Sequence, residues 1–391
     1  TLDRILKQCH SFVANPDSNY MDDIFAQKLK AFSNPAFSSE DQKKLCTYHH
    51  KLILTEVIPA YQKLADSLES LRGTGKSSRG LAFFEGGREY YLYLLQSQTG
   101  TYVPVGQIEK RMSAQLLSDY REISSLLKQD SSLIDRLNQC SSELTLTPTQ
   151  MLEKLPELMK KDFPELKDAT YELRTVHPSM KKFLSPAFYL TPPVDTRSPN
   201  VIYINDSGRT SSLELFGTLA HEGFPGHLYQ TVSFAGNNPS DIRYLVTSSG
   251  YVEGWATYVE SYGYEYAASL MNDPDSAKNA VRLAWVNRSM NLCIYSLIDI
   301  GIHYRGWDAA RTAVFLRAFG INNASTAAEI YQYIVETPGN YLKYYWGYLN
   351  FLDLKTVCQK RLGDDFDLKE FHRRILDIGP VQFPVLEKYM K

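Results

Sequence analysis

The sequence predicts a predominantly α-helical protein with one small β-sheet. Apolar residues recur with the period of an α-helix through most of the chain, and residues 200–205 alternate as a strand does. With 391 residues, of which 43% are apolar, the chain can bury a large core. We therefore expect a large helical fold. It is built either as one continuous domain or as an N-terminal helical region over 1–198 and a second helical region over 199–391.

Helix start signals support the order of the elements. Thr147, Pro148 and Gln150 occupy the N-cap, first and third positions of a capping box, and Ser211 and Glu214 repeat its spacing. In chain order, the sequence predicts helices over 2–30 and 39–71 and then a polar loop over 72–79. A helix that begins at 90, helices over 105–129 and 130–140, and a helix that begins at 147 follow. After an extended proline-rich segment over 185–199 and a strand over 200–205, the sequence predicts a helix that begins at 211, helices over 248–266 and 277–304, and a helix that begins at 338.

Residues 221–227 read His-Glu-Gly-Phe-Pro-Gly-His, which is close to the signature of a zinc hydrolase. In the usual motif the two histidines are four residues apart and lie on one helix face. Here His227 follows His221 by six positions, which on an ideal helix separates the side chains by about 120°. Pro225 has no N–H for the carbonyl of His221, and Gly226 permits unusual backbone angles. We therefore expect the helix to break between the histidines, so that both reach one zinc ion.

Three glutamates are candidates for the rest of such a site. Glu222 adjoins the first histidine, where a general base takes a proton from water. Glu253 lies 26 positions after His227 and has a glycine three positions before it and another directly after it, which allow close helix packing. It is the expected third zinc ligand, and Glu260 could orient a ligand histidine. The alternative is that the histidines are ordinary helix-end residues and the glutamates lie on solvated helix faces.

Composition excludes several classes of protein. The formal net charge of −2 gives no reason to expect nucleic acid or an anionic membrane as a partner. The sequence contains no run of about 18 apolar residues, so it predicts no transmembrane helix. The five cysteines are widely spaced, so they predict neither a disulfide framework nor a structural zinc site. The chain begins at Thr1 without an initiator methionine, as expected of a mature or trimmed form.

Five segments of the chain resemble the bacterial domain-of-unknown-function family numbered 885, and the resemblance is strongest from about 199 to 391. That family is similar to helical zinc peptidases of the thimet oligopeptidase, angiotensin-converting enzyme and carboxypeptidase Taq kind. The resemblance implies a gluzincin-type hydrolase, with a large helical zinc-metallopeptidase-like fold, a deep cleft and a small β-sheet beside the active site. Its members often carry an export or lipoprotein leader, which implies an extracytoplasmic location. The segments are 221–230 (HEGFPGHLYQ), 251–260 (YVEGWATYVE), 299–307 (DIGIHYRGW), 338–347 (PGNYLKYYWG) and 362–388 (LGDDFDLKEFHRRILDIGPVQFPVLEK).

The resemblance adds two residues that spacing alone would not identify. His303 matches the histidine of the family's Gly-x-His-x-x-Gly-Trp pattern, and Tyr344 matches the tyrosine of its Tyr-x-x-Gly pattern. In related zinc peptidases a histidine and a tyrosine donate hydrogen bonds to the tetrahedral oxyanion. Asp299, one turn before His303, could fix the imidazole by a hydrogen bond.

Together these patterns predict a zinc metallopeptidase that acts on a peptide or small amide, as an exopeptidase or on short oligopeptides. The N-terminal helices are expected to form the other wall of the cleft. Two alternatives stay open. One is a zinc amidase on a non-peptide or cell-wall amide, and the other is a catalytically silent peptide-binding protein. The predicted site comprises His221, His227 and Glu253 as zinc ligands, Glu222 as the base, and His303 and Tyr344 as oxyanion donors.

Overall fold

The computed structural model describes residues 2–32, 38–75, 77–166 and 169–390. Its contacts divide the chain into two compact units. Unit 1 is Thr1–Ser78 with His177–Ser179, and unit 2 is Arg79–Val176 with Met180–Lys391. The division between these units therefore falls at residue 78. Residues 79–176 and 180–198 lie in the same unit as the whole of 199–391.

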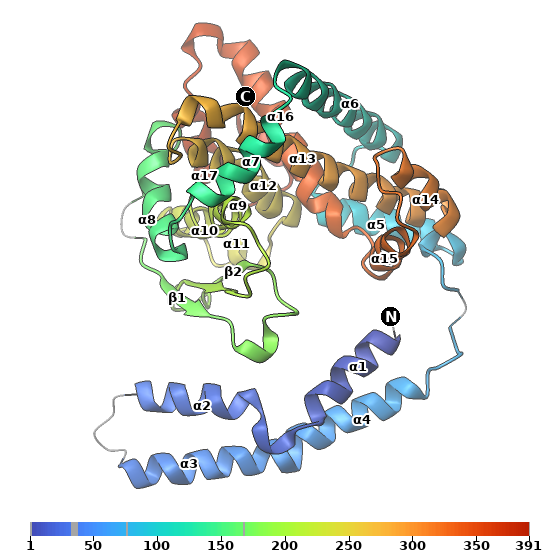
Figure 1. Ribbon diagram of the computed structural model, residues 1–391, viewed down its shortest axis with the longest axis vertical. Coiled ribbons are helices and arrows are strands. Elements are labelled where there is room, and N and C mark those ends of the chain that lie inside the picture. Colours follow the sequence, from blue (N-terminus) through green and yellow to red (C-terminus); the bar gives the residue numbers. More distant parts are fainter. Residues whose placement is uncertain (1, 33–37, 76, 167–168, 391) are drawn as a thin grey trace. The chain divides into compact units, whose positions relative to one another are not determined.

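Unit 1 is made of helices (Figure 1). The single helix expected over 2–30 is instead two helices, because Pro16 opens a short 3-10 turn between them. The helical stretch expected over 39–71 passes through a π-helical turn at Ile53–Val57. Leu6, Cys9 and Ala65 form a small core between the first and last helices of the unit. The helices are α1 (Leu2–Val13), α2 (Tyr20–Ala31), α3 (Ser39–Leu52) and α4 (Ile58–Glu69).

Unit 2 holds most of the buried core and is also mainly helical (Figure 1). The capping box expected at Thr147 is present, with its side chain accepting from the Gln150 N–H at 3.3 Å. The helices are α5 (Gly87–Thr99), α6 (Val105–Gln129), α7 (Leu133–Glu143), α8 (Pro148–Leu158), α9 (Ser212–Glu222), α10 (His227–Gly236), α11 (Ile242–Leu245), α12 (Ser249–Ala268), α13 (Pro274–Ile300), α14 (Ala309–Arg317), α15 (Ala324–Glu336), α16 (Asn340–Leu362), α17 (Leu368–Ile378) and α18 (Phe383–Met390). Short turns are η3 (Leu81–Phe83) and the π-helical η6 (Gly301–Arg305), which continues α13.

A three-stranded sheet completes unit 2, as the sequence predicted. Its strands are β1 (Glu172–Thr175), β2 (Ala187–Leu190) and β3 (Val201–Ile204), in the order β1-β3-β2. Strand β1 runs parallel to β3, and β2 runs antiparallel to it. The predicted strand over 200–205 is therefore central and paired on both sides. The free edges of this sheet belong to β1 and β2.

Helix α12 is the element around which the site is built, because it packs against both α9 and α16. A Cβ added to Gly254 would lie 2.5 Å from the Cα of Gly347 on α16. A Cβ added to Gly263 would lie 2.5 Å from the Cβ of Ala220 on α9. The backbones therefore meet where only small residues fit. As a result, the residues next to these contacts on three helices lie close together.

The mostly helical class predicted from the sequence is confirmed. Across the described residues, no helix combines the length and apolar character that crossing a bilayer requires.

Candidate metal centre

The helix carrying the first histidine ends where the sequence predicted a break. Helix α9 begins with a capping box at Ser211 and ends at Glu222, and α10 begins at His227. The imidazole rings of His221 and His227 have centroids 4.8 Å apart and planes at 88°. The spacing of six residues is therefore compatible with two imidazoles at one point.

The turn between α9 and α10 has no space for another residue type at Gly226. A Cβ there would lie 1.8 Å from the carbonyl oxygen of His221. The preceding Phe224–Pro225 peptide bond is cis. The indole N–H of Trp255 on α12 donates to the carbonyl oxygen of Pro225 at 2.9 Å, which ties the turn to α12. The turn is thus fixed by tertiary contacts as well as by its own sequence.

The donor atoms at this point suit a zinc ion. One ligand atom each from His221, Glu222 and His227 lie within 4.8 Å of one another. In addition, Glu253 Oε2 lies 3.7 Å from His221 Nε2 and 3.4 Å from His227 Nε2. Two ligands that are each about 2.1 Å from a tetrahedral zinc ion are about 3.4 Å apart. The two imidazoles and Glu253 therefore have the separations of a ligand set.

The two carboxylates at this point have different partners. Glu222 Oε2 accepts a hydrogen bond from the main-chain N–H of Tyr189 at 2.9 Å. Tyr189 lies on the edge strand β2, so the sheet reaches the site. Glu253 therefore faces the Nε2 atoms of both imidazoles, whereas Glu222 lies beside them with one oxygen bound to the sheet. A main-chain donor such as Tyr189 has no sequence signature, and sequence reasoning missed it.

Charge at the site favours a cation. Burial lowers the pKa of His221, but hydrogen bonds to Glu253 and Glu260 outweigh it and raise that pKa to about 10. Burial raises the pKa of Glu253, but hydrogen bonds from His221 and His227 hold it well below its usual range. A divalent ion could bind between the ionised carboxylate and the two imidazoles, where it would replace the proton on the His221 ring.

Glu260 is not on a solvated helix face, since only 4% of it is exposed. Its Oε2 lies 3.3 Å from His221 Nδ1, and its Oε1 accepts from Arg288 Nε at 3.0 Å. Burial raises the pKa of Glu260, but Arg288 and His221 together lower it below its ordinary value. Glu260 therefore holds one imidazole nitrogen and turns the other toward Glu253.

Helix α16 contributes two side chains, because Gly347 allows it to approach α12. The ring of Tyr344 lies 6.3 Å from that of His221. Burial and the nearby charges of Glu253 and Glu222 raise the pKa of Tyr344, so the phenol keeps its proton and can donate. Lys343 Nζ lies 3.6 Å from Glu253 Oε1. The sequence did not indicate Lys343, because a lysine among tyrosines on a helix is typical of a solvated position.

The structure does not bring His303 to this cluster. The ring is fully buried, its Nδ1 accepts from the Leu81 N–H at 3.1 Å, and its Nε2 lies 2.9 Å from the Ile334 carbonyl oxygen. Burial lowers its pKa, so the imidazole is neutral. With both nitrogens bound to main-chain groups, it has no N–H for an oxyanion. In this arrangement neither ring nitrogen is free for the oxyanion role that the family pattern implied, and His303 instead joins η3, η6 and α15.

The hydrogen bond expected between Asp299 and His303 is also absent from the described contacts. Asp299 instead accepts from the Tyr91 hydroxyl at 2.5 Å and from the Gly339 N–H at 2.9 Å. It therefore anchors the start of α16 to α5 and α13.

Comparisons with known proteins place the chain in a family without assigning a reaction. Residues 1–390 match the family described as "Bacterial protein of unknown function (DUF885)". The search of curated proteins gave no match. The solved structure titled "The crystal structure of the putative lipoprotein from Colwellia psychrerythraea" has a TM-score of 0.84 and 20% identity, over 100% of this chain and 69% of that one. A "putative lipoprotein of unknown function from Shewanella oneidensis" has a TM-score of 0.61 and 17% identity, over 98% of this chain and 73% of that one. At these identities the likeness concerns the fold alone.

Proposed function

We propose that this chain, which belongs to the DUF885 family of bacterial proteins of unknown function, is a zinc-dependent hydrolase of peptide bonds. The observation that carries the proposal is the convergence of His221, His227 and Glu253. Their facing atoms are separated by 3.4 and 3.7 Å where the carboxylate meets each imidazole. Two histidines and one glutamate, with a second glutamate alongside, are the donor set of many hydrolytic zinc sites.

Each residue near the ligands has a chemical task in this proposal. A bound zinc ion would supply Lewis acidity and lower the pKa of a water molecule to about 7. Glu222 removes a proton from the attacking water as its oxygen bonds to the carbonyl carbon. When the carbon–nitrogen bond breaks, Glu222 delivers that proton to the departing amine. The Tyr344 phenol donates a hydrogen bond to the carbonyl oxygen as that oxygen gains negative charge.

The position of Glu222 supports this role over that of a fourth ligand. The Tyr189 amide holds one oxygen of its carboxylate, which leaves the other to accept a proton. His303 has no task in the reaction. The titles of both solved structures include the word lipoprotein, which supports an extracytoplasmic location as part of the proposal.

A mass-spectrometric digest of a peptide library tests the proposal directly. The purified protein, with its zinc content measured, should cleave peptides near one end or short peptides, and a chelator should abolish cleavage. Zinc should restore it. Zinc-loaded protein that cleaves no peptide would contradict peptide hydrolysis, and hydrolysis of a cell-wall amide by the same preparation would favour an amidase. Protein that binds peptides but holds no zinc would favour a silent binding protein.

A further inference from the structure

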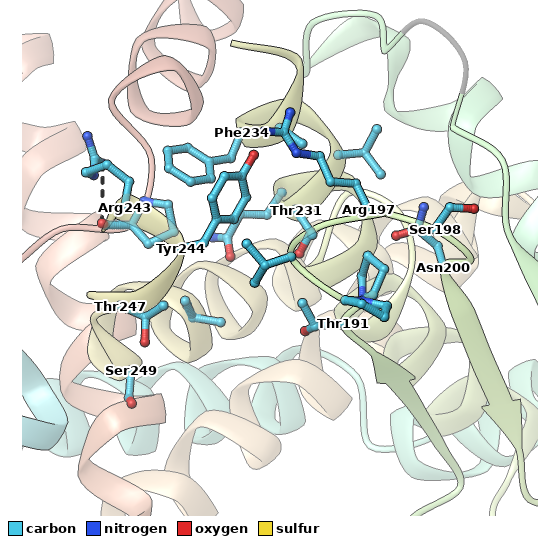
Figure 2. A pocket seen from close by; sticks show the side chains of 18 of the residues that line it. Thr191, Arg197, Ser198, Asn200, Thr231, Phe234, Arg243, Tyr244, Thr247 and Ser249 are labelled. Carbon is cyan, nitrogen blue, oxygen red and sulfur yellow. Dashed lines mark hydrogen bonds between the residues drawn. The ribbon is translucent and has the colours of Figure 1, made fainter. Parts of the chain in front are cut away.

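Figure 2 shows a cavity of about 410 Å³. Glu253 is among the residues that line it, so the cavity adjoins the candidate metal centre. Its wall is formed by the segment that follows β2, by one face of α10 and by α11. Among the residues that line it, Glu253 is the one acidic side chain, and Arg197 and Arg243 are the basic ones. If Glu253 binds a metal ion, the cavity is left with two guanidinium groups and no free carboxylate.

Neither arginine is neutralised by an acidic side chain in the described part of the chain. The Arg197 guanidinium lies 5.1 Å over the Tyr244 ring, and its nearest polar partner is Asn238 Oδ1 at 3.5 Å. The Arg243 guanidinium lies 5.2 Å from the Phe234 ring centroid, and one of its nitrogens donates to the Ile378 carbonyl oxygen at 2.8 Å and to the Pro380 carbonyl oxygen at 3.4 Å. Aromatic faces hold a guanidinium without cancelling its charge or using its in-plane N–H groups.

The two rings also contact each other, with centroids 5.5 Å apart. Arg197, Tyr244, Phe234 and Arg243 therefore form a continuous row along the cavity, and Figure 2 shows Tyr244 between Arg197 and Phe234. Such a row fixes both guanidinium groups beside one space.

Two further donors of the cavity wall have no acceptor among the described residues. Gln230 is 3% exposed, and its side-chain N–H group makes no hydrogen bond. The Tyr244 hydroxyl is likewise enclosed and without a partner. Buried donors are almost always paired in folded proteins, so an unpaired one indicates a missing partner. Gln230 follows His227 by three positions on α10, which puts it next to the metal centre.

We propose that this cavity binds a carboxylate of the peptide substrate beside the bond that is cut. This inference rests on the proposed function and names its substrate class. Guanidinium groups with free N–H donors match the two oxygens of a carboxylate, and the unpaired amide and hydroxyl supply further donors. In a peptide the carboxylate comes from the chain terminus or from an aspartate or glutamate side chain.

Four versions of one cleaved peptide separate the two sources. They carry a free or amidated C-terminus, each combined with glutamate or glutamine beside the scissile bond. In the parent protein, removal of the carboxylate that the cavity binds should lower kcat/KM by about 10- to 100-fold, and removal of the other carboxylate should not. The ratio to compare is kcat/KM for the acid form of the peptide divided by kcat/KM for its amide form. Arg197→Gln should reduce this ratio toward one, and Tyr244→Phe, which keeps the ring, should reduce it several-fold. Arg317→Gln, on the exposed surface of α14, controls for net charge and should leave the ratio unchanged.

A binding experiment makes the outcome independent of turnover. Calorimetry with acetyl-alanyl-glutamate and with its diamide should show tighter binding of the acid, and Arg197→Gln should remove the difference. Peptides that are cut with no preference for a carboxylate in any version would overturn this inference and leave the proposed function intact. Carboxylate binding without cleavage of any peptide would contradict the proposed function and support the cavity's role. A preference for the carboxylate that survives in both Arg197→Gln and Tyr244→Phe would mean that other residues bind the carboxylate, and it would overturn the proposal.

Discussion

Two histidines of unit 2, His221 and His303, are both buried on helical segments and both belong to sequence patterns of one family, yet their surroundings are opposite. His221 is enclosed by carboxylates, and hydrogen bonds to Glu253 and Glu260 raise its pKa to about 10 against the effect of burial. His303 is enclosed by main-chain groups, and burial lowers its pKa. A pattern match therefore locates a histidine, while the chemistry of its partners determines what it can do.

The surroundings of His221 form a first region and those of His303 a second, and the acidic side chains of these two regions differ in the same way. Glu253 faces two imidazoles, and its pKa is held far below the usual range. Asp299 is fully buried, and burial raises its pKa to about 7 although Tyr91 and Gly339 donate hydrogen bonds to it. The first region is therefore suited to hold a cation. The second is suited to hold a proton and to join three segments of the core.

The largest expected effect concerns Glu222. Glu222→Gln removes the base and keeps the shape of the side chain, so kcat should fall by about 10²- to 10⁴-fold while zinc content is unchanged. Asp299→Asn in the second region is the matched control, and kcat should stay within a few-fold of the parent. Steady-state kinetics with metal analysis measures both. Full activity in zinc-loaded Glu222→Gln would remove Glu222 from the role of base.

The next effect concerns the orientation of His221. Glu260→Gln removes the charge beside His221 Nδ1, and the zinc dissociation constant should rise by about 10- to 100-fold. Competition with a chromophoric chelator measures the constant. An unchanged affinity would show that the contact at 3.3 Å does not orient the ring.

Local sequence identified the residues that the structure brings together around His221. The break at Pro225 and Gly226, the neighbouring Glu222 and the glycines around Glu253 all act over a few residues, so their consequences could be derived without a structure. The mostly helical class and the strand near 200–205 follow from periodicity in the same way.

The second region could not be predicted, because its partners are distant in sequence and belong to the main chain. Leu81 is 222 positions from His303, and an N–H group has no residue type. The same reason explains why Tyr189 and the arginines of the cavity were missed. The helix break at Pro16 was missed because the apolar period continues across it.

The third prediction concerns His303. His303→Phe keeps a ring against Tyr91 but leaves the Leu81 N–H and the Ile334 carbonyl unpaired, which should lower the free energy of unfolding by about 1–3 kcal/mol. Zinc affinity should not change. Chemical denaturation and chelator competition measure the two quantities. A loss of zinc affinity, or lower kcat at unchanged stability, would return His303 to the active site.

The smallest expected effect is a pH dependence of stability in the zinc-free protein. The pKa of His221 is about 10 in the folded state and about 6.5 in an unfolded chain. A group whose pKa is raised by folding contributes stability that is complete below the unfolded pKa and is lost as the pH rises through the folded pKa. The free energy of unfolding should therefore fall by about 1 kcal/mol between pH 7.5 and 8.5.

Other groups also titrate in this range, so the informative quantity is the difference from zinc-free His221→Gln, which lacks this contribution. Saturating zinc should abolish the difference in slope, because the ion replaces the proton on His221 and holds the ring neutral at every pH in the range. Parallel slopes for the parent and His221→Gln without zinc would mean that the carboxylates around His221 do not hold a proton there, and the contrast with His303 would then rest on geometry alone.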